Sequence, residues 1–273
     1  MSSILNENKD VTGEYLQKAE NLKKNILGYF YNKEKNTFNY LIDHQGTVNN
    51  SQEGLGISFA VMFGIIKGEN ANQLIGNTVV SKYGITSIYP DFSRYFAEKP
   101  GRHNNIIWPM VNGFFANAAV VAGNYKSFTN ELNSLTHLAL DADKGDYNFR
   151  EIYNPYSGKP DGGYQASGKE LPNYHWESCR TQTWSATAYI NMINYGLAGI
   201  RIENDGMSFA PYLPENVHYL ELKDITYRQA VLKIIIKGNG AKIKSFLVNG
   251  KNQVNHKIDS KIKGSNVITI ELG

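Results

Sequence analysis

The sequence predicts a mainly α protein that ends in a small β-sandwich, and two observations indicate this. Apolar residues recur at helical spacing through most of the chain up to about residue 206. Beyond that point the pattern changes to short runs of β-branched and aromatic residues with turn signals between them. We therefore expect a helical domain over residues 1–206 and a C-terminal β-sandwich domain over residues 207–273.

About six helices are expected in the first domain. The first should end near Phe30, because apolar residues lie on one helical face at Leu16, Ala19, Leu22, Ile26, Leu27 and Phe30. Similar patterns occupy residues 53–68, 71–84, 106–123, 127–144 and 182–199. The segments 57–66 and 106–121 are apolar on nearly all sides, so neighbouring elements should surround each of them.

Roughly five to seven short strands are expected in the second domain. They are indicated by the runs "VHYLEL", "AVLKIIIKGNG", "IKSFLVNGK" and "VITIEL". The Asn-Gly pairs at 239–240 and 249–250 are typical of tight hairpins. A unit of about 65 residues buries little apolar area, so we expect it to pack on the helical domain.

Composition excludes several classes of protein. The chain has 273 residues, of which 41% are hydrophobic and 19% charged, as in an ordinary globular protein. The net charge is +3 without a block of five like charges, so no nucleic-acid partner is expected. The single Cys179 permits no intrachain disulfide, and no metal-ligand spacing is present. The N-terminus lacks the pattern of a signal peptide and no long apolar run occurs, so we expect a cytoplasmic protein without a membrane partner.

The long connections between the helices are where we expect the chemistry. Residues 84–105 and 145–181 are rich in Tyr, Asn, Gly and Pro, and loops of that length are usually functional. The stretches 49–56, 89–109, 148–165 and 164–184 collect Tyr, Trp, His, Arg, Asn and Glu at helix entrances. Aromatic rings stack on the apolar faces of sugars, while amides, carboxylates and guanidinium groups bind their hydroxyls. The pattern therefore indicates a carbohydrate site.

Glu151 is the strongest single candidate, because it lies in no obvious helix and has aromatic residues two positions to either side. Other candidates have plainer explanations. Trp108 and Trp184 could be core residues at helix starts, and His103 could be a solvated loop residue. Glu53 could be a first-turn acid that complements the helix dipole, with Asn50 or Ser51 as the cap.

Five stretches resemble, in order, motifs of the inverting glycosidases with an (α/α)6 toroid, which include processing α-glucosidases and mannosylglycerate hydrolase-like enzymes. "NFREIYNPYSG" resembles the family's F-x-E-x-Y-x-P-x-[ST]-G segment, in which the Glu is the general base. "GRHNNIIWPMVNGFFANAAV" and "QEGLGISFAVMFGI" are similar to two of its helix starts. "TQTWSATAYINMINYGLAGIRIENDGMSFAPYLP" resembles the last toroid helix and its exit, and the β-rich tail resembles the small C-terminal β domain.

The resemblance implies a partial toroid. A complete (α/α)6 toroid has twelve helices, whereas about six are expected here, all similar to its second half. The family's general acid is an Asp on an earlier loop, and none of Asp43, Asp91 and Asp161 has the expected setting. The chain therefore resembles the C-terminal part of a glycosidase, secreted or periplasmic if a longer precursor exists. Its helix flanks are expected to self-associate or to pair with a separate N-terminal barrel half.

The resemblance further implies inverting hydrolysis of an O-glycosidic bond, with Glu151 as general base and no metal or organic cofactor. The implied substrate contacts are Arg102, His103, Trp108, Tyr153, Trp176, Gln182, Trp184 and Glu53. Three alternatives remain open. The chain could be a non-catalytic carbohydrate-binding fragment, or a scaffold that presents apolar helix flanks to a partner. It could also be a glycoside phosphorylase, in which phosphate replaces water, although Glu151 argues against that.

Overall fold

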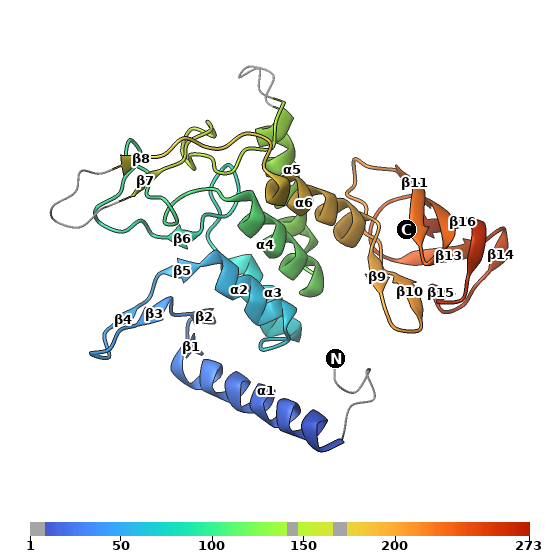
Figure 1. The fold of residues 1–273 in the computed structure, drawn as a ribbon, viewed down its shortest axis with the longest axis horizontal. Coiled ribbons are helices and arrows are strands. Elements are labelled where there is room, and N and C mark those ends of the chain that lie inside the picture. Colours follow the sequence, from blue (N-terminus) through green and yellow to red (C-terminus); the bar gives the residue numbers. More distant parts are fainter. Residues whose placement is uncertain (1–8, 141–146, 166–173) are drawn as a thin grey trace. The chain divides into compact units, whose positions relative to one another are not determined.

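The computed structural model describes residues 9–140, 147–165 and 174–273 (Figure 1). The chain divides into two compact units, residues 1–189 and 190–273. The α-helices of the described residues are α1 Lys9–Tyr29, α2 Gly54–Met62, α3 Gly68–Asn77, α4 Pro109–Val121, α5 Tyr125–Leu140 and α6 Thr183–Asn191. A π-helical segment, η2 Met192–Leu197, follows α6 directly. Among the described residues no helix is both long and apolar enough to cross a membrane.

The prediction of a mainly α fold was wrong. The described chain is 33% helical and 29% strand, which makes it a mixed α/β protein. Apolar runs that predict long helices end early, because α2 stops at Met62 and a left-handed Gly64 (φ +67°) follows it. The connections between the helices also contain short paired strands, which no alternation of apolar and polar residues in the sequence predicts.

Helix α4 is the centre of the first unit. It packs against α2, α3 and α5, and α2 and α4 lie side by side (Figure 1). Pro109 occupies the first helical turn, where its missing N–H costs nothing. Gly113 allows α6 to approach, since a Cβ there would lie 2.6 Å from Ala188 Cβ. As expected, α4 is surrounded by neighbours: Phe115 and Ala116 are fully buried.

Short strand pairs tie the connections of the first unit together. They are β1 Tyr31–Asn32 with β2 Thr37–Phe38, β3 Leu41–Ile42 with β4 Val48–Asn49, β5 Gln52–Glu53 with β6 Ile88–Tyr89, and β7 Tyr164–Gln165 with β8 Tyr174–His175. Isolated bridges join Gly101 to Tyr164 and Ile107 to Tyr153. Two connections that are distant in sequence, 84–108 and 147–165, therefore lie against each other.

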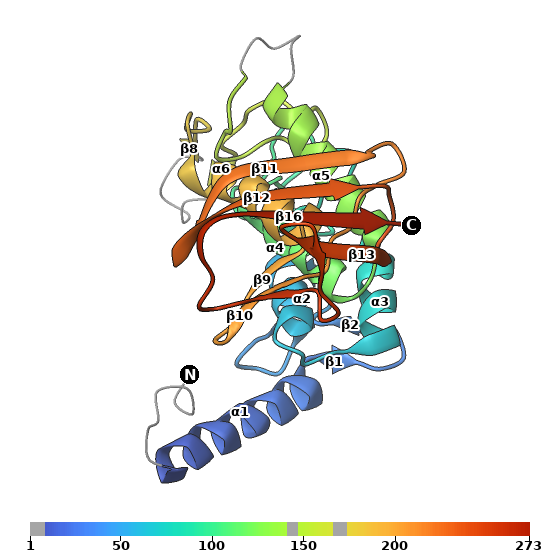
Figure 2. The ribbon, with the colours of Figure 1, turned by 90° about the vertical axis from the view of Figure 1, so that its right-hand side faces the viewer.

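The second unit contains two sheets. One has the order β15-β10-β9 and is built from Lys257–Asp259, Gly206–Phe209 and Ile200–Ile202. The other has the order β11-β12-β16-β13-β14, from Tyr219–Tyr227, Gln229–Lys237, Lys263–Leu272, Ile243–Val248 and Lys251–Asn252. Figure 2 shows β11, β12, β16 and β13 side by side, with β12 and β16 parallel. Buried residues alternate along β12, and Phe209 of β10 packs against Phe246 of β13, with ring centroids 5.4 Å apart.

Candidate active site

Glu151 lies in the 147–165 connection, and its backbone is held on one side by the irregular segment between β8 and α6. Its N–H donates to the carbonyl of Cys179 at 2.9 Å. The next residue, Ile152, accepts a hydrogen bond from the Ser178 hydroxyl at 2.6 Å and donates its N–H to the same hydroxyl at 3.0 Å. Glu151 is only 6% exposed, so its carboxylate is held in a fixed environment.

Arg102 comes from the other long connection and forms an ion pair with this carboxylate. Its Nη2 lies 2.7 Å from Glu151 Oε1, and both side chains are largely buried. Its Nη1 donates to the carbonyl of Gly162 at 2.8 Å, and its guanidinium carbon lies 5.1 Å from the centre of the Trp176 ring. The buried negative charge is thus balanced by a cation that has several further contacts to hold it.

Two glycines allow this close packing. A Cβ at Gly162 would lie 2.4 Å from the Trp176 carbonyl oxygen. Gly163 has φ +74°, and a Cβ there would lie 2.8 Å from the Arg102 nitrogen. The "DGG" stretch therefore passes between the segments that carry Arg102 and Trp176 only because both of its last two residues lack side chains.

Three rings form what we call the helix-end ring cluster: His103, Trp108 and Trp184. The centroids of His103 and Trp108 are 4.9 Å apart, and those of Trp108 and Trp184 are 6.0 Å apart, both edge to face. Trp108 is the N-cap residue of α4, and its buried Nε1 has no hydrogen-bond partner within the described residues. Burial lowers the pKa of His103, and the neighbouring Arg102 charge lowers it further against an opposing effect of Glu151.

Residues 1–185 match the family model of the mannosylglycerate hydrolase MGH1-like glycoside hydrolase domain. The chain belongs to this family. Residues 200–259 match the C-terminal domain of glycosyl hydrolase family 65. The predicted resemblance to glycosidases with a C-terminal β domain is therefore confirmed.

Among solved structures, the chain is similar to a GH78 family rhamnosidase of Bacillus sp. GL1. The two are 13% identical with a TM-score of 0.48, and the match covers 95% of this chain and 24% of the rhamnosidase chain. The chain thus spans about a quarter of the length of that enzyme. A comparison with curated proteins found no match.

Six of the predicted site residues fall into two groups. Arg102, Glu151 and Trp176 are in contact, as described above. His103, Trp108 and Trp184 form the helix-end ring cluster, and His103 directly follows Arg102. Long-range pairing of the two connections is what joins these positions, since Arg102 and Glu151 are 49 residues apart in sequence.

Tyr153 and Gln182 have structural contacts. Tyr153 is 1% exposed, and its hydroxyl accepts from the Arg150 N–H at 3.0 Å and donates to the Asn148 carbonyl at 3.1 Å. The Gln182 N–H donates to the Phe149 carbonyl at 2.9 Å, and its own carbonyl accepts from Ala186 at the start of α6. Both residues therefore anchor the segment around Glu151.

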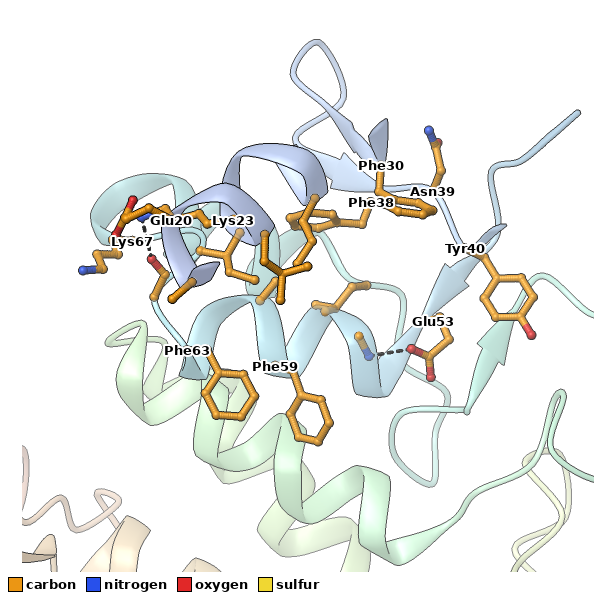
Figure 3. Close-up of a pocket in the computed structure, with 18 residues that line it drawn as sticks. Glu20, Lys23, Phe30, Phe38, Asn39, Tyr40, Glu53, Phe59, Phe63 and Lys67 are labelled. Atoms are coloured by element: carbon orange, nitrogen blue, oxygen red, sulfur yellow. Dashed lines mark hydrogen bonds between the residues drawn. The ribbon is translucent and has the colours of Figure 1, made fainter. Parts of the chain in front are cut away.

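Glu53 lies apart from these groups as the N-cap of α2. Its carboxylate accepts from the Leu55 N–H at 3.1 Å and from the Gly56 N–H. Burial raises its pKa against the opposing effect of these hydrogen bonds. It lines a cavity of about 630 Å³ between α1 and α2, at the end near Tyr40, whereas Phe59 and Phe63 follow α2 (Figure 3). The helix-dipole interpretation is supported, although the cap is Glu53 itself rather than Asn50 or Ser51.

Sequence reasoning missed the residues that hold the β7–β8 hairpin. Asp161 Oδ1 lies 2.8 Å from His175 Nε2 and accepts from the Gly163 N–H at 2.8 Å. The His175 ring stacks on Tyr164, its cross-strand partner, at 4.3 Å. The run of ring residues "YHW" at 174–176 is the signal that could have indicated this strand. In the described part of the chain no group of three or more His, Cys, Asp or Glu residues is arranged to hold a metal ion.

Proposed function

We propose that this chain forms the water-activating side of an inverting glycoside hydrolase site, with Glu151 as the general base. The observation that supports the proposal most strongly is the Arg102–Glu151 ion pair at 2.7 Å, enclosed by loops that carry exposed aromatic rings. Membership of a glycoside hydrolase family supplies the reaction class. The substrate is accordingly a carbohydrate with an O-glycosidic bond.

The chemistry of inversion needs a carboxylate that accepts a proton. Glu151 would take a proton from a water molecule while the water oxygen bonds to the anomeric carbon on the face opposite the leaving group. The glycosidic C–O bond breaks, and its electron pair leaves on an oxygen that a separate general acid protonates. In such enzymes the two carboxyl groups stand about 6.5–9.5 Å apart to admit the water.

From the sequence, Arg102 was expected to bind a hydroxyl of the sugar. In this proposal it has a different role. Its guanidinium is held by the carbonyl of Gly162 and aligned against Glu151 Oε1, so it acts as a positioning residue for the base. With Oε1 committed to Arg102, the second carboxylate oxygen is the one that would receive the proton. His103, Trp108 and Trp184 supply ring surfaces for the sugar that is cleaved.

Hydrolysis of aryl α-glycosides by the full chain tests the proposal. Proton NMR of the first product should give the β anomer from an α-linked substrate, and Glu151→Gln should lower the rate by at least about 10²-fold. Glu98→Gln, which changes an exposed acid of the 84–105 connection, should leave the rate unchanged. Retention of configuration, or an unchanged rate in Glu151→Gln, would remove Glu151 from the proposed role.

Carbohydrate binding without catalysis is the second candidate function. The exposed rings of Trp176 and Trp184, 41% and 42% accessible, favour it because they offer sugar-stacking surfaces that need no acid. A wild-type chain that binds glycosides but hydrolyses none of them would select this function over the enzyme.

A further inference from the structure

The β7–β8 hairpin has two faces with different chemistry. In a strand, side chains at i and i+2 share a face, which places Tyr174 and Trp176 together and His175 opposite them. On the His175 face, the His175 ring stacks on Tyr164 and contacts the Asp161 carboxylate. The other face presents what we call the hairpin ring pair, Tyr174 and Trp176.

The hairpin ring pair is both exposed and fixed. Tyr174 is 59% and Trp176 41% exposed, and their centroids are 4.7 Å apart in an edge-to-face arrangement. Trp176 Nε1 donates to Gln165 Oε1 at 3.1 Å across the hairpin, and the Trp176 N–H donates to the Gly163 carbonyl at 3.0 Å. Rings held in this way lose little conformational entropy when a flat apolar ligand face covers them.

The hairpin ring pair and the helix-end ring cluster approach the ion pair through different contacts. Trp176 touches the Arg102 guanidinium, which in turn holds Glu151. The helix-end ring cluster begins at His103, the residue after Arg102. Two separate ring surfaces thus flank Arg102, the partner of Glu151, whereas a single sugar ring needs only one of them.

We propose that Tyr174 and Trp176 form an outer subsite for a second sugar ring, so that the preferred substrates are glycosides of at least two rings. The inference rests on the proposed function, because it places the scissile bond at Glu151 between the two ring surfaces. Sugar C–H faces would stack on the rings, and the Arg102 charge behind Trp176 leaves the exposed ring face to the ligand.

Binding should be measured in the full chain with Glu151→Gln, so that hydrolysis does not consume the ligand. The probes are the methyl α-glycosides of mannose and glucose and the matching α-linked methyl disaccharides. For the sugar that binds, the disaccharide should bind about tenfold more tightly than the monosaccharide. All three tryptophans of the chain lie in these two ring groups, so intrinsic fluorescence reports the binding directly.

Matched variants separate the two ring surfaces. Trp176→Ala and Tyr174→Ala should each weaken disaccharide binding while leaving monosaccharide binding within about twofold, with Trp176→Ala the larger at about tenfold. Trp176→Phe should retain most of the disaccharide affinity that Trp176→Ala loses. If the hairpin had collapsed in Trp176→Ala, a phenylalanine would not be expected to recover it. Trp184→Ala should weaken the binding of both ligands. Tyr29→Ala removes a ring of α1 that is 67% exposed and should change the affinity for neither ligand.

Equal affinity for the two ligand sizes would overturn the outer subsite, as would a Trp176→Ala effect of the same size on both. Failure of every probe to bind would overturn it as well. Failure of the proposed function is a different result, since it is read from hydrolysis by the chain that retains Glu151. If the chain hydrolyses monosaccharide and disaccharide substrates equally well, the proposal of Glu151 as the base stands and only the outer subsite is overturned.

Discussion

Two buried glutamates, Glu131 and Glu151, lie in regions that differ in secondary structure and in the groups that contact the carboxylate. Glu131 lies within α5, is fully buried, and accepts from the Ile85 N–H at 3.1 Å and from Asn112 Nδ2 at 2.6 Å. Glu151 lies in an irregular connection and is paired with the guanidinium of Arg102. The first acid is surrounded by neutral donors and helix packing, and the second by a cation and exposed rings.

The difference teaches that burial of an acid alone does not indicate a reactive site. Glu131 joins α4, α5 and the segment at Ile85, and both of its carboxylate oxygens accept hydrogen bonds within the fold. Glu151 also has a fixed partner, but the exposed rings around it leave a surface for a ligand. This contrast supports a structural role for Glu131 and agrees with the chemical role proposed for Glu151.

The largest expected effect on stability is at Glu131. Glu131→Ala leaves the Ile85 N–H and the Asn112 amide buried without an acceptor and opens a cavity between two helices. We expect the free energy of unfolding to fall by about 4 kcal/mol. Urea unfolding followed by circular dichroism measures it, with Glu98→Ala as the exposed control. A loss below about 1 kcal/mol would show that Glu131 does not hold these elements together.

The pH dependence of stability should also trace to Glu131. Burial raises the pKa of Glu131 from 4.5 to about 7, against the opposing effect of its hydrogen bonds from Asn112 and Ile85. Because the folded chain binds this proton more tightly than the unfolded chain, the contribution is complete below about pH 4.5 and is lost as pH rises through about 7. We expect stability to fall by about 3 kcal/mol over that window.

The difference between the wild type and Glu131→Gln isolates this contribution. Chemical unfolding of both proteins at several pH values between about 4.5 and 8 should show the decline in the wild type and a flatter profile in the variant. Parallel profiles would assign the pH dependence to other groups.

A smaller effect is expected at Arg102. The guanidinium contacts Glu151 and the Gly162 carbonyl at the same time, which the single ammonium of a lysine cannot reproduce. Arg102→Lys should lower hydrolysis by about tenfold and change the free energy of unfolding by under about 1 kcal/mol, because a cation still faces the carboxylate. Steady-state rates and thermal melts measure the two quantities. Full activity in Arg102→Lys would show that charge alone positions the base.

Local patterns predicted some elements well. Trp108-Pro109 marks the start of α4, and the Asn-Gly pair at 249–250 forms the predicted tight hairpin, with both residues at positive φ between β13 and β14. The same dipeptide at 239–240 does not make a hairpin. Strand β12 pairs with β11 and β16 instead of β13, and this choice of partners is set by long-range packing.

The candidate site was only partly predictable for the same reason. The motif around Glu151 indicated an important acid, and ring residues at helix starts indicated ligand surfaces. The partner of Glu151 was not visible, because Arg102 reaches it only after two long connections pair. Tyr153 matched a motif position but is enclosed in the core with Ile107 and Leu138, which spacing alone cannot reveal.

The decisive measurement for the role of Glu151 compares the hydrolysis rates of Glu151→Gln and Glu131→Gln with that of the wild type. Each rate is corrected for the folded fraction. Both substitutions neutralise a buried carboxylate with little change of shape. If Glu151 is the base, Glu151→Gln loses at least about 10²-fold in rate and Glu131→Gln stays within about twofold. Equal losses in the two variants, or a larger loss in Glu131→Gln, would contradict it.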